Sequence, residues 1–164
     1  RKDQLRRKVK DIEYFSTKMI NELLRKKNFI KNIHIDYNDF QILLRGVDNH
    51  IINKDTLSAG EKELLILSLI WGTIHSSKKQ LPFVFDTLLG RLDLEHKSSV
   101  INKLIPKFGN QIIILSTNSE ITDDLYTDLS PYISNEYTLN YNINNKRTNI
   151  ECHFFNNTKE GARI

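Results

Sequence analysis

The sequence predicts an α/β fold with a mostly parallel sheet and flanking helices, preceded by a coiled-coil segment and followed by a β-hairpin. Two apolar runs without polar alternation, residues 81–85 and 111–115, are typical of parallel strands that are covered on both faces. A helical pattern over about residues 94–107 joins them as the crossover of a βαβ unit. We therefore divide the chain into a coiled-coil stub, residues 1–31, and a globular part, residues 32–164.

The first segment carries a heptad pattern. Its seam positions are spaced by four and three residues, and five of the six are apolar: Leu5, Val9, Ile12, Ser16, Met19 and Leu23. This spacing predicts a projecting coiled-coil helix. A seam this short is marginal alone. The helical pattern is already under way at Arg1, so we expect the partner helix to come from the chain upstream of that residue.

Composition and charge are those of a water-soluble globular chain, with 39% hydrophobic and 27% charged residues. Residues 1–31 hold eleven Lys and Arg against four acids, whereas residues 32–164 hold thirteen against sixteen. A basic first segment can attract polyanions in a salt-dependent way. A solvated helical face is the simpler interpretation of the same charges.

Disulfides, metal clusters and membrane spans are not predicted. The single cysteine, Cys152, excludes an intrachain disulfide, so we expect a cytoplasmic location. The longest nearly apolar run, residues 64–74, is too short to cross a bilayer, so we expect no membrane contact. Five scattered histidines receive no ligand role: His34, His50, His75, His96 and His153.

Two antiparallel hairpins are predicted from alternating apolar residues. The first pairs residues 33–37 with residues 40–44. The second closes the chain and pairs residues 136–141 with residues 148–155 across an Asn-rich turn.

A strongly apolar helix that ends near His75 is preceded by residues 57–62, which read Leu-Ser-Ala-Gly-Glu-Lys. Ser58 and Glu61 have the spacing of a capping box. Free backbone N–H groups, a hydroxyl and a glycine that allows close approach also make such a helix start a site for phosphate. A well-capped helix without a ligand is the simpler alternative.

The strand at residues 81–85 is followed at once by Asp86. This places a carboxylate at the C-terminal edge of a parallel sheet, where it can hold the Mg²⁺ of a bound nucleotide through water. Gly90 then turns the loop and directs Arg91 and Asp93 outward, which is consistent with an interface across a nucleotide. A surface aspartate and a solvated loop are the alternatives.

These two segments and the strand that ends in Ser116 and Thr117 resemble three motifs of ABC-type ATPases in order and spacing: the signature motif, Walker B with its D-loop, and the switch region. The Leu-Ser-x-Gly-Glu-Lys form and the preceding coiled coil resemble the SMC and double-strand-break-repair branch. The chain contains no Gly-x-x-x-x-Gly-Lys-[Ser/Thr] loop. The resemblance is therefore to the C-terminal lobe of a P-loop ATPase head without its Walker A half.

A finer resemblance lies in residues 86–93 and 115–121, which read Asp-Thr-Leu-Leu-Gly-Arg-Leu-Asp and Leu-Ser-Thr-Asn-Ser-Glu-Ile. Both are similar to the DndD family, the ATPases of bacterial DNA sulfur modification, or phosphorothioation, a restriction-modification system. That family usually has Pro where this chain has Leu88. The resemblance implies an ATP hydrolase that acts on DNA together with other subunits of a sulfur-modification complex.

The resemblance also implies roles for individual residues. ATP held by a second head would be contacted by the signature residues Ser58, Ala59, Gly60 and Glu61, and Asp86 would bind Mg²⁺. The D-loop residues Gly90, Arg91 and Asp93 would act across the homodimer. The switch would consist of Ser116 and Thr117. The N-terminal Walker A half of the same protein would complete the site. We therefore expect this chain alone to be inactive and to bind ATP and Mg²⁺ weakly.

Thr87 and Thr117 stand where general SMC-like heads carry a Glu and a His. Neither threonine can be a general base near neutral pH, so we expect Thr87 and Thr117 at most to orient water and we expect slow turnover. Two alternatives therefore stay open. One is a nucleotide-gated clamp that tethers DNA with little hydrolysis, and the other is a repair or anti-phage defence ATPase of another SMC-like branch.

Overall fold

The computed structural model describes residues 2–26 and 28–152, and the chain forms two compact units, Arg1–Glu120 and Ile121–Ile164. The main elements of the first unit are α1 (Lys2–Leu23), β1 (Asn32–Ile35), β2 (Ile42–Arg45), β3 (Ile51–Ile52), α2 (Ala59–Ser77), β4 (Phe83–Asp86), α3 (Leu94–Ser99) and β5 (Ile112–Leu115). The second unit contains α4 (Asp123–Leu129), β6 (Tyr137–Asn142) and β7 (Arg147–Cys152). The predicted boundary at residue 31 stays a prediction.

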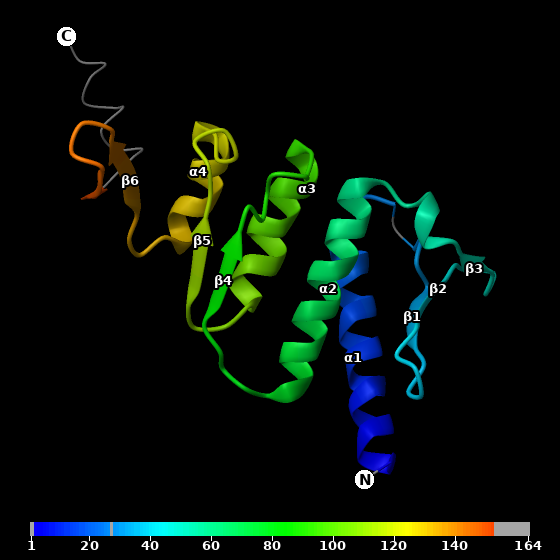
Figure 1. The fold of residues 1–164 in the computed structure, drawn as a ribbon. Helices are drawn as coiled ribbons and strands as arrows, with labels where there is room; N and C mark the ends of the chain where they lie inside the picture. The colour runs from blue at the N-terminus through cyan, green and yellow to red at the C-terminus, as the bar shows by residue number, and fades with distance from the viewer. Residues whose placement is uncertain (1, 27, 153–164) are drawn as a thin grey trace. The chain divides into compact units, whose positions relative to one another are not determined.

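Helices α1 and α2 lie side by side in the first unit (Figure 1). They approach most closely at Gly72, where an added Cβ would overlap Ser16 Oγ and lie 3.1 Å from the carbonyl oxygen of Ile12. Phe15 of α1 packs edge-on against the ring of Trp71, with ring centroids 6.1 Å apart. The seam therefore finds a partner inside the chain, and our expectation that its partner comes only from upstream is wrong. Of the six seam residues, Leu5 at the start of α1 is the only exposed one.

The first hairpin is confirmed. Strands β1 and β2 pair antiparallel, with Ile33 opposite Leu44, and both side chains are buried. The outer edge of β1 is occupied by side chains of α1, because Thr17 Oγ1 accepts a hydrogen bond from the N–H of Ile33 at 2.9 Å and Glu13 Oε1 accepts one from Ile35 at 2.7 Å. Helix α1 thus protects an edge that would otherwise be open to further strand pairing.

The βαβ crossover is also confirmed. Strands β4 and β5 pair parallel, with Asp86 opposite Leu115. They are joined by a helical run made of α3, a π turn (Val100–Leu104) and a 3₁₀ turn (Ile105–Lys107). At the end of this run, Phe108 packs against Phe83 and Phe85, with ring centroids 5.0 and 4.9 Å apart.

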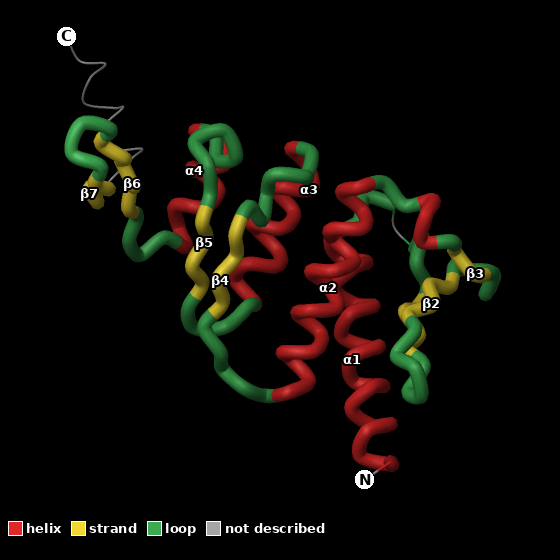
Figure 2. The backbone as a smooth tube through the Cα atoms, in the orientation of Figure 1, coloured by secondary structure: helices red, strands yellow, loops and turns green. Residues whose placement is uncertain are grey.

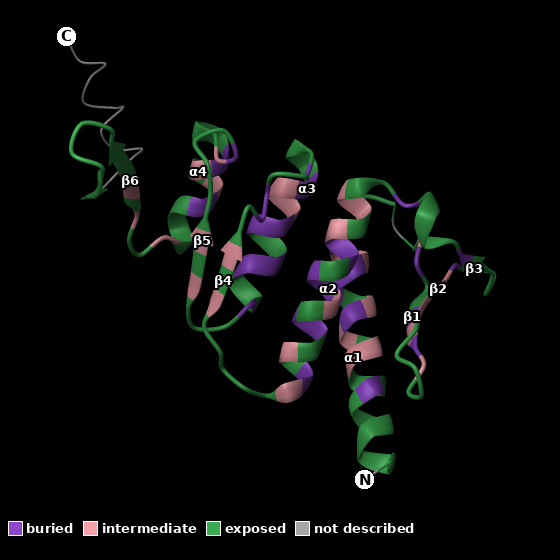
Figure 3. Ribbon diagram, viewed as in Figure 1, coloured by how far each residue is buried: buried purple, intermediate pink, exposed green. Residues whose placement is uncertain are grey.

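The opposite face of the β4–β5 sheet is open within the described chain. Val84 is 61% exposed, Ile113 43% and Leu115 47% (Figure 3). The expectation that these strands are covered on both faces is therefore wrong for this chain. A run without polar alternation requires two apolar environments in the complete protein, and the described residues provide one of them.

The sheets are mixed, so the prediction of a mostly parallel sheet is wrong. The described strands form an antiparallel sheet in the order β1-β2-β3, the parallel pair β4–β5 and the antiparallel pair β6–β7 (Figure 2). The reason is that short turns join the strands of both hairpins, and a short turn permits antiparallel pairing only.

The second unit, described by itself, begins with α4, whose N-cap is Thr122 and whose buried residues are Leu125 and Leu129. The predicted closing hairpin is confirmed as far as Cys152, and residues 153–155 lie outside the described residues. Its apolar side chains are exposed: Tyr137, Leu139, Tyr141, Ile143 and Ile150. Among the described helices of the chain, none is long and apolar enough to cross a membrane.

Candidate functional site

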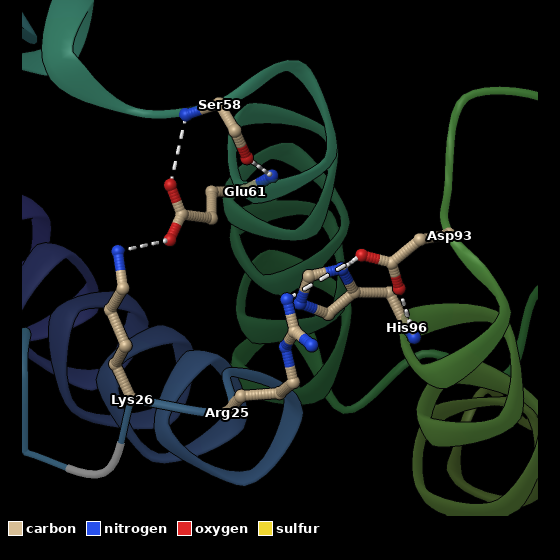
Figure 4. A pocket seen from close by; sticks show the side chains of 6 residues that line it. All are labelled: Arg25, Lys26, Ser58, Glu61, Asp93 and His96. Atoms are coloured by element: carbon tan, nitrogen blue, oxygen red, sulfur yellow. Dashed lines mark hydrogen bonds and ion pairs between the residues drawn. The ribbon is translucent and has the colours of Figure 1, made fainter.

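The start of helix α2 has the predicted capping box. Ser58 Oγ accepts a hydrogen bond from the N–H of Glu61 at 3.2 Å, and Glu61 Oε2 accepts one from the N–H of Ser58 at 2.9 Å (Figure 4). Ser58 itself has extended backbone angles, as an N-cap residue requires. The helix is 19 residues long, so its first turn presents a partial positive charge and N–H groups of Ala59 and Gly60 toward solvent.

A hollow of about 280 Å³ opens beside this helix start. It is lined by Arg25, Lys26, Ser58, Glu61, Asp93 and His96 (Figure 4). The two cations come from the segment after α1. The dipole of helix α2 and the charges of Arg25 and Lys26 make the hollow suitable for an anion such as phosphate. The carboxylates of Glu61 and Asp93, which also line it, offset part of that positive charge.

Lys26 pairs with one carboxylate beside this hollow and Arg25 with two. Lys26 Nζ lies 3.2 Å from Glu61 Oε1. Arg25 Nη2 lies 3.8 Å from Asp93 Oδ2, and its Nη1 donates to Glu95 Oε2 at 2.7 Å. The end of the α1 segment is therefore tied both to the signature motif and to the D-loop.

Asp93 is the N-cap of α3, since its Oδ1 accepts a hydrogen bond from the N–H of His96 at 2.9 Å. The buried ring of His96 brings Nδ1 within 3.1 Å of Asp93 Oδ2, but outside hydrogen-bonding geometry. Asp93 thus has a structural role beside the predicted one at an interface. Arg91 is exposed, as predicted.

The carboxyl groups at the hollow have lowered pKa values. Burial acts to raise the pKa of Glu61, but hydrogen bonding from Ser58 and the charge of Lys26 outweigh it and hold the pKa below its usual value. The pKa of Asp93 is lowered chiefly by the hydrogen bond from the His96 N–H, and His96 and Arg25 add to this. Contact with Glu95, and then Asp93, raises the pKa of Arg25.

The end of β4 places Asp86 and Thr87 in solvent. The N–H of Thr87 still donates to the carbonyl of Leu115 at 3.0 Å, but its φ is 54°, in the left-handed region. A β-branched residue is strained there. Asp86 is an exposed carboxylate at the strand end that belongs to no cluster of three or more metal-ligating side chains among the described residues, which fits a Mg²⁺ held through water and nucleotide better than a closed protein cage. No group of three or more metal-ligating side chains exists among residues 2–26 and 28–152.

The loop after Thr87 alternates solvent-facing and buried residues. Leu88, Leu89 and Leu92 are buried, whereas Gly90 and Arg91 are exposed. Leu88 is thus one of three apolar anchors that fix the loop.

The switch segment is folded around Glu120. Thr117 donates its N–H to Glu120 Oε2 at 2.9 Å, and the N–H of Glu120 donates to the Thr117 carbonyl at 3.1 Å. The hydroxyl of Thr117 lies 3.1 Å from that of Ser119. Ser116 and Thr117 are exposed, as a residue that meets a nucleotide must be.

The structure brings the three motifs to one edge of the first unit, where the start of α2 and the C-terminal ends of β4 and β5 lie (Figure 1). A Cβ on Gly60 would lie 3.8 Å from the carbonyl oxygen of Arg91, and one on Gly90 would lie 3.7 Å from that of Thr87. The D-loop therefore connects the signature motif to Walker B. Ser58 shares the hollow with Asp93, whereas Asp86 and Thr117 do not line it.

Sequence reasoning missed four side chains at this edge: Arg25, Lys26, His96 and Glu120. Basic residues at the end of a helix and a histidine three residues after an N-cap are common in sequences. Their place in a site becomes visible only through the contacts that distant segments make in the fold. The fold and the edge define the class: an α/β unit whose exposed polar residues gather at the carboxyl ends of two parallel strands, the edge at which open α/β sheets bind ligands.

Comparison with known proteins narrows this class. No family model and no curated protein matches the chain. Solved structures do, among them one from a study of ATP-driven dimerization and DNA-stimulated activation of SMC ATPases, with 12% identity and a TM-score of 0.69 over 98% of this chain and 94% of that chain.

Two SMC head domains are also similar. The head from Thermotoga maritima has 18% identity and a TM-score of 0.58, and this chain covers 51% of it with 92% of its own length. The head with a coiled coil and joint from Pyrococcus yayanosii has 13% identity and a TM-score of 0.67, with 97% of this chain and 30% of that chain covered. The chain thus has the fold of part of an SMC head domain.

Proposed function

We propose that this chain is the C-terminal half of an SMC-like ATP-binding head, which hydrolyses ATP and acts on DNA as part of a complete protein. One observation carries the proposal: the anion-suited start of α2 and the strand-end carboxylate of Asp86 lie on one edge and are connected by the D-loop. Similarity in fold to SMC head domains supports it.

In this proposal the nucleotide lies between two heads. Ser58, Ala59 and Gly60 meet the terminal phosphate of ATP bound to the opposite head, and Asp86 holds Mg²⁺ on its own side. The Mg²⁺ would neutralise charge that develops on the phosphates. Gly90, Arg91 and Asp93 then lie at the interface between the heads.

The Walker A half of the head packs, in the same proposal, on the open face of the β4–β5 sheet. Val84, Ile113 and Leu115 supply an apolar surface there that the described chain leaves uncovered. An exposed apolar sheet face next to a ligand-binding edge is typical of a surface that a second part of the protein covers. Without that half, the chain holds only one side of the phosphate site.

Hydrolysis in the complete protein is slow, because Thr87 and Thr117 have no basic group to activate water. Positioning of the nucleotide and electrostatic stabilisation of its phosphates remain as the sources of catalysis. A nucleotide-gated clamp is therefore the second candidate function, favoured by the two threonines. Turnover measured with and without DNA separates the two, since a clamp retains DNA with ATP bound and gains no turnover from it.

The DNA transaction that we propose is phosphorothioation, because residues 86–93 and 115–121 are similar to the DndD family in their sequence. The partners would be DNA and other subunits of a sulfur-modification complex in the cytoplasm. Among the similar structures, one Smc head was solved bound to a domain of ScpA, which supports a protein partner for this head as well. Identification of the proteins that co-purify with the complete protein distinguishes a sulfur-modification ATPase from a repair or anti-phage ATPase.

The experiment that tests the proposal uses the complete protein and the substitution Ser58→Ala. Both ATP-dependent dimerisation and turnover should fall, because the hydroxyl faces the phosphate site. The matched control is Thr122→Ala, which also removes an N-cap, from α4, at a similar cost of about 1 kcal/mol. The proposal is wrong if the two variants behave alike, or if the wild-type protein neither binds nor hydrolyses ATP.

A further inference from the structure

A buried carboxylate connects two of the motifs described above. Glu120 is only 6% exposed, although it ends the switch segment at the solvent-facing edge of the sheet. Its Oε2 accepts the hydrogen bond from the Thr117 N–H. Its Oε1 is buried without a hydrogen-bond partner in the described structure, which is costly for a carboxylate oxygen.

The unpaired oxygen lies against the D-loop. A Cβ added to Gly90 would be 2.6 Å from Glu120 Oε1, so any larger residue at position 90 would displace the Glu120 carboxylate. The same loop turn is closed by the N–H of Gly90, which donates to the Thr87 carbonyl at 3.3 Å. The carboxylate thus fills the space between the switch and the turn that follows Walker B.

A third contact fixes the backbone of Glu120. Lys97 Nζ donates to its carbonyl oxygen at 3.0 Å, and the N–H of Lys97 donates to the carbonyl of Asp93, at the end of the D-loop, at 2.9 Å. Glu120 is therefore bonded to the switch through its side chain and to α3 through its backbone, and its second carboxylate oxygen lies against Gly90. A residue packed between segments in this way can transmit a displacement from one to the other.

We infer that Glu120 is a positioning residue that couples the switch segment to the D-loop, so that a displacement of Thr117 moves Gly90 and the reverse. The consequence for catalysis rests on the proposed function. There, contact between Thr117 and a nucleotide would move the D-loop into the position in which two heads associate. The physical link between the two segments exists without nucleotide.

Amide hydrogen exchange on the nucleotide-free complete protein tests the link directly. Glu120→Ala should speed exchange of the Thr117 amide by roughly fivefold, because that amide loses its acceptor. The Gly90 amide keeps its acceptor, the Thr87 carbonyl, and should also exchange faster, because the turn that it closes loses the packing of the carboxylate. The Thr87 amide, which bonds across the sheet to Leu115, should not change. Asp124→Asn, an exposed acid nearby in sequence, is the matched control. Unchanged exchange at Gly90 overturns the inference.

A double-mutant cycle tests the route. A methyl group at residue 90 would meet Glu120 Oε1 first, and the other oxygen of that carboxylate accepts the hydrogen bond from the Thr117 N–H. Gly90→Ala should therefore speed Thr117 exchange in the wild-type background and have no further effect in the Glu120→Ala background. Additive effects of the two substitutions would show that the segments respond independently, and would refute the coupling.

Turnover then separates this inference from the proposed function. Glu120→Ala should lower kcat by roughly 5- to 30-fold with an unchanged KM for ATP, and Glu120→Gln, which keeps an acceptor oxygen for Thr117, should restore most of it. If Glu120→Gln is as defective as Glu120→Ala, the carboxylate transfers protons and a positioning role is refuted. Absence of ATP turnover in the wild type contradicts the proposed function, while the exchange results still decide the coupling.

Discussion

The seam of α1 was predicted to need a partner from outside this chain, and the strand pair β4–β5 was predicted to be covered on both faces; the structure pairs α1 with α2 and leaves one face of the strands open. In the helix pair, Met19 and Leu64 are completely buried, and the backbones meet at Ser16 and Gly72. In the strand pair, one face rests on Phe108 and the other is open. The difference indicates where the proposed N-terminal half would pack: on the open face of the sheet and not on the seam.

The largest effect is expected on the covered face of the sheet. Phe108 is 1% exposed, and Phe108→Ala should lower the free energy of unfolding by about 3–5 kcal/mol, because the cavity cannot close between two strands and a helix. Urea denaturation of the 164-residue chain measures this. Phe40→Ala is the control, since Phe40 is 57% exposed. A loss below about 1 kcal/mol at Phe108 would mean that this face is not a core.

A smaller effect is expected where the helices touch. Gly72→Ala should destabilise the chain by about 1–3 kcal/mol, because the methyl group meets backbone atoms of α1. Gly60→Ala in the same helix is the matched control: its Cβ would lie at ordinary contact distances of 3.6–3.8 Å, and alanine is the better helix former. Thermal unfolding followed by circular dichroism compares them. Equal melting temperatures would contradict the close approach of α1 and α2.

The ion pairs beside the helix pair should give a pH-dependent difference. Because the folded-state pKa of Glu61 is lowered, its carboxylate stabilises the fold above the unfolded-state value of about 4.3, and this stability is lost as the pH falls through the folded pKa. Glu61→Gln should therefore cost about 1 kcal/mol at pH 7 and almost nothing at strongly acidic pH. Denaturation midpoints across this pH range are the measurement, and a constant difference would argue against the capping carboxylate.

The smallest effect is expected on the open face. Val84→Thr should change the stability of the 164-residue chain by less than about 0.5 kcal/mol, yet weaken association with the N-terminal half, measured by calorimetry. Val100→Thr, at a fully buried position of the helical run, should instead destabilise the chain by about 1–3 kcal/mol. If Val84→Thr leaves association unchanged, the N-terminal half covers another surface.

Local patterns predicted local structure well in this chain. The capping box at Ser58 and Glu61, both hairpins and the parallel pairing of β4 with β5 follow from residue spacing and turn length, and all are present. These features depend on neighbours in the sequence. The heptad seam of α1 was equally clear, but a seam does not specify its partner, and α2 carries no heptad that would have identified it.

The candidate site was predicted only in part for the same reason. Its exposed residues Asp86, Thr87, Arg91 and Thr117 follow from motifs, and their roles stay predictions. Glu120 and the cations after α1 enter the site through contacts between segments that are far apart in sequence, such as Arg25 with Asp93. A charged residue in sequence does not show which opposite charge it will meet, because that depends on how the helices pack.

The alternation of buried and exposed residues after β4 has a consequence for how such a protein can change over time. Leu88, Leu89 and Leu92 fix the path of the loop from inside, so the side chains that face solvent at positions 86, 87 and 91 contribute little to keeping it folded. Lineages can therefore exchange reactive groups there, for instance an acid for a threonine, while the scaffold is inherited intact. In such a loop, the rate of the reaction can change during evolution while the path of the backbone stays the same.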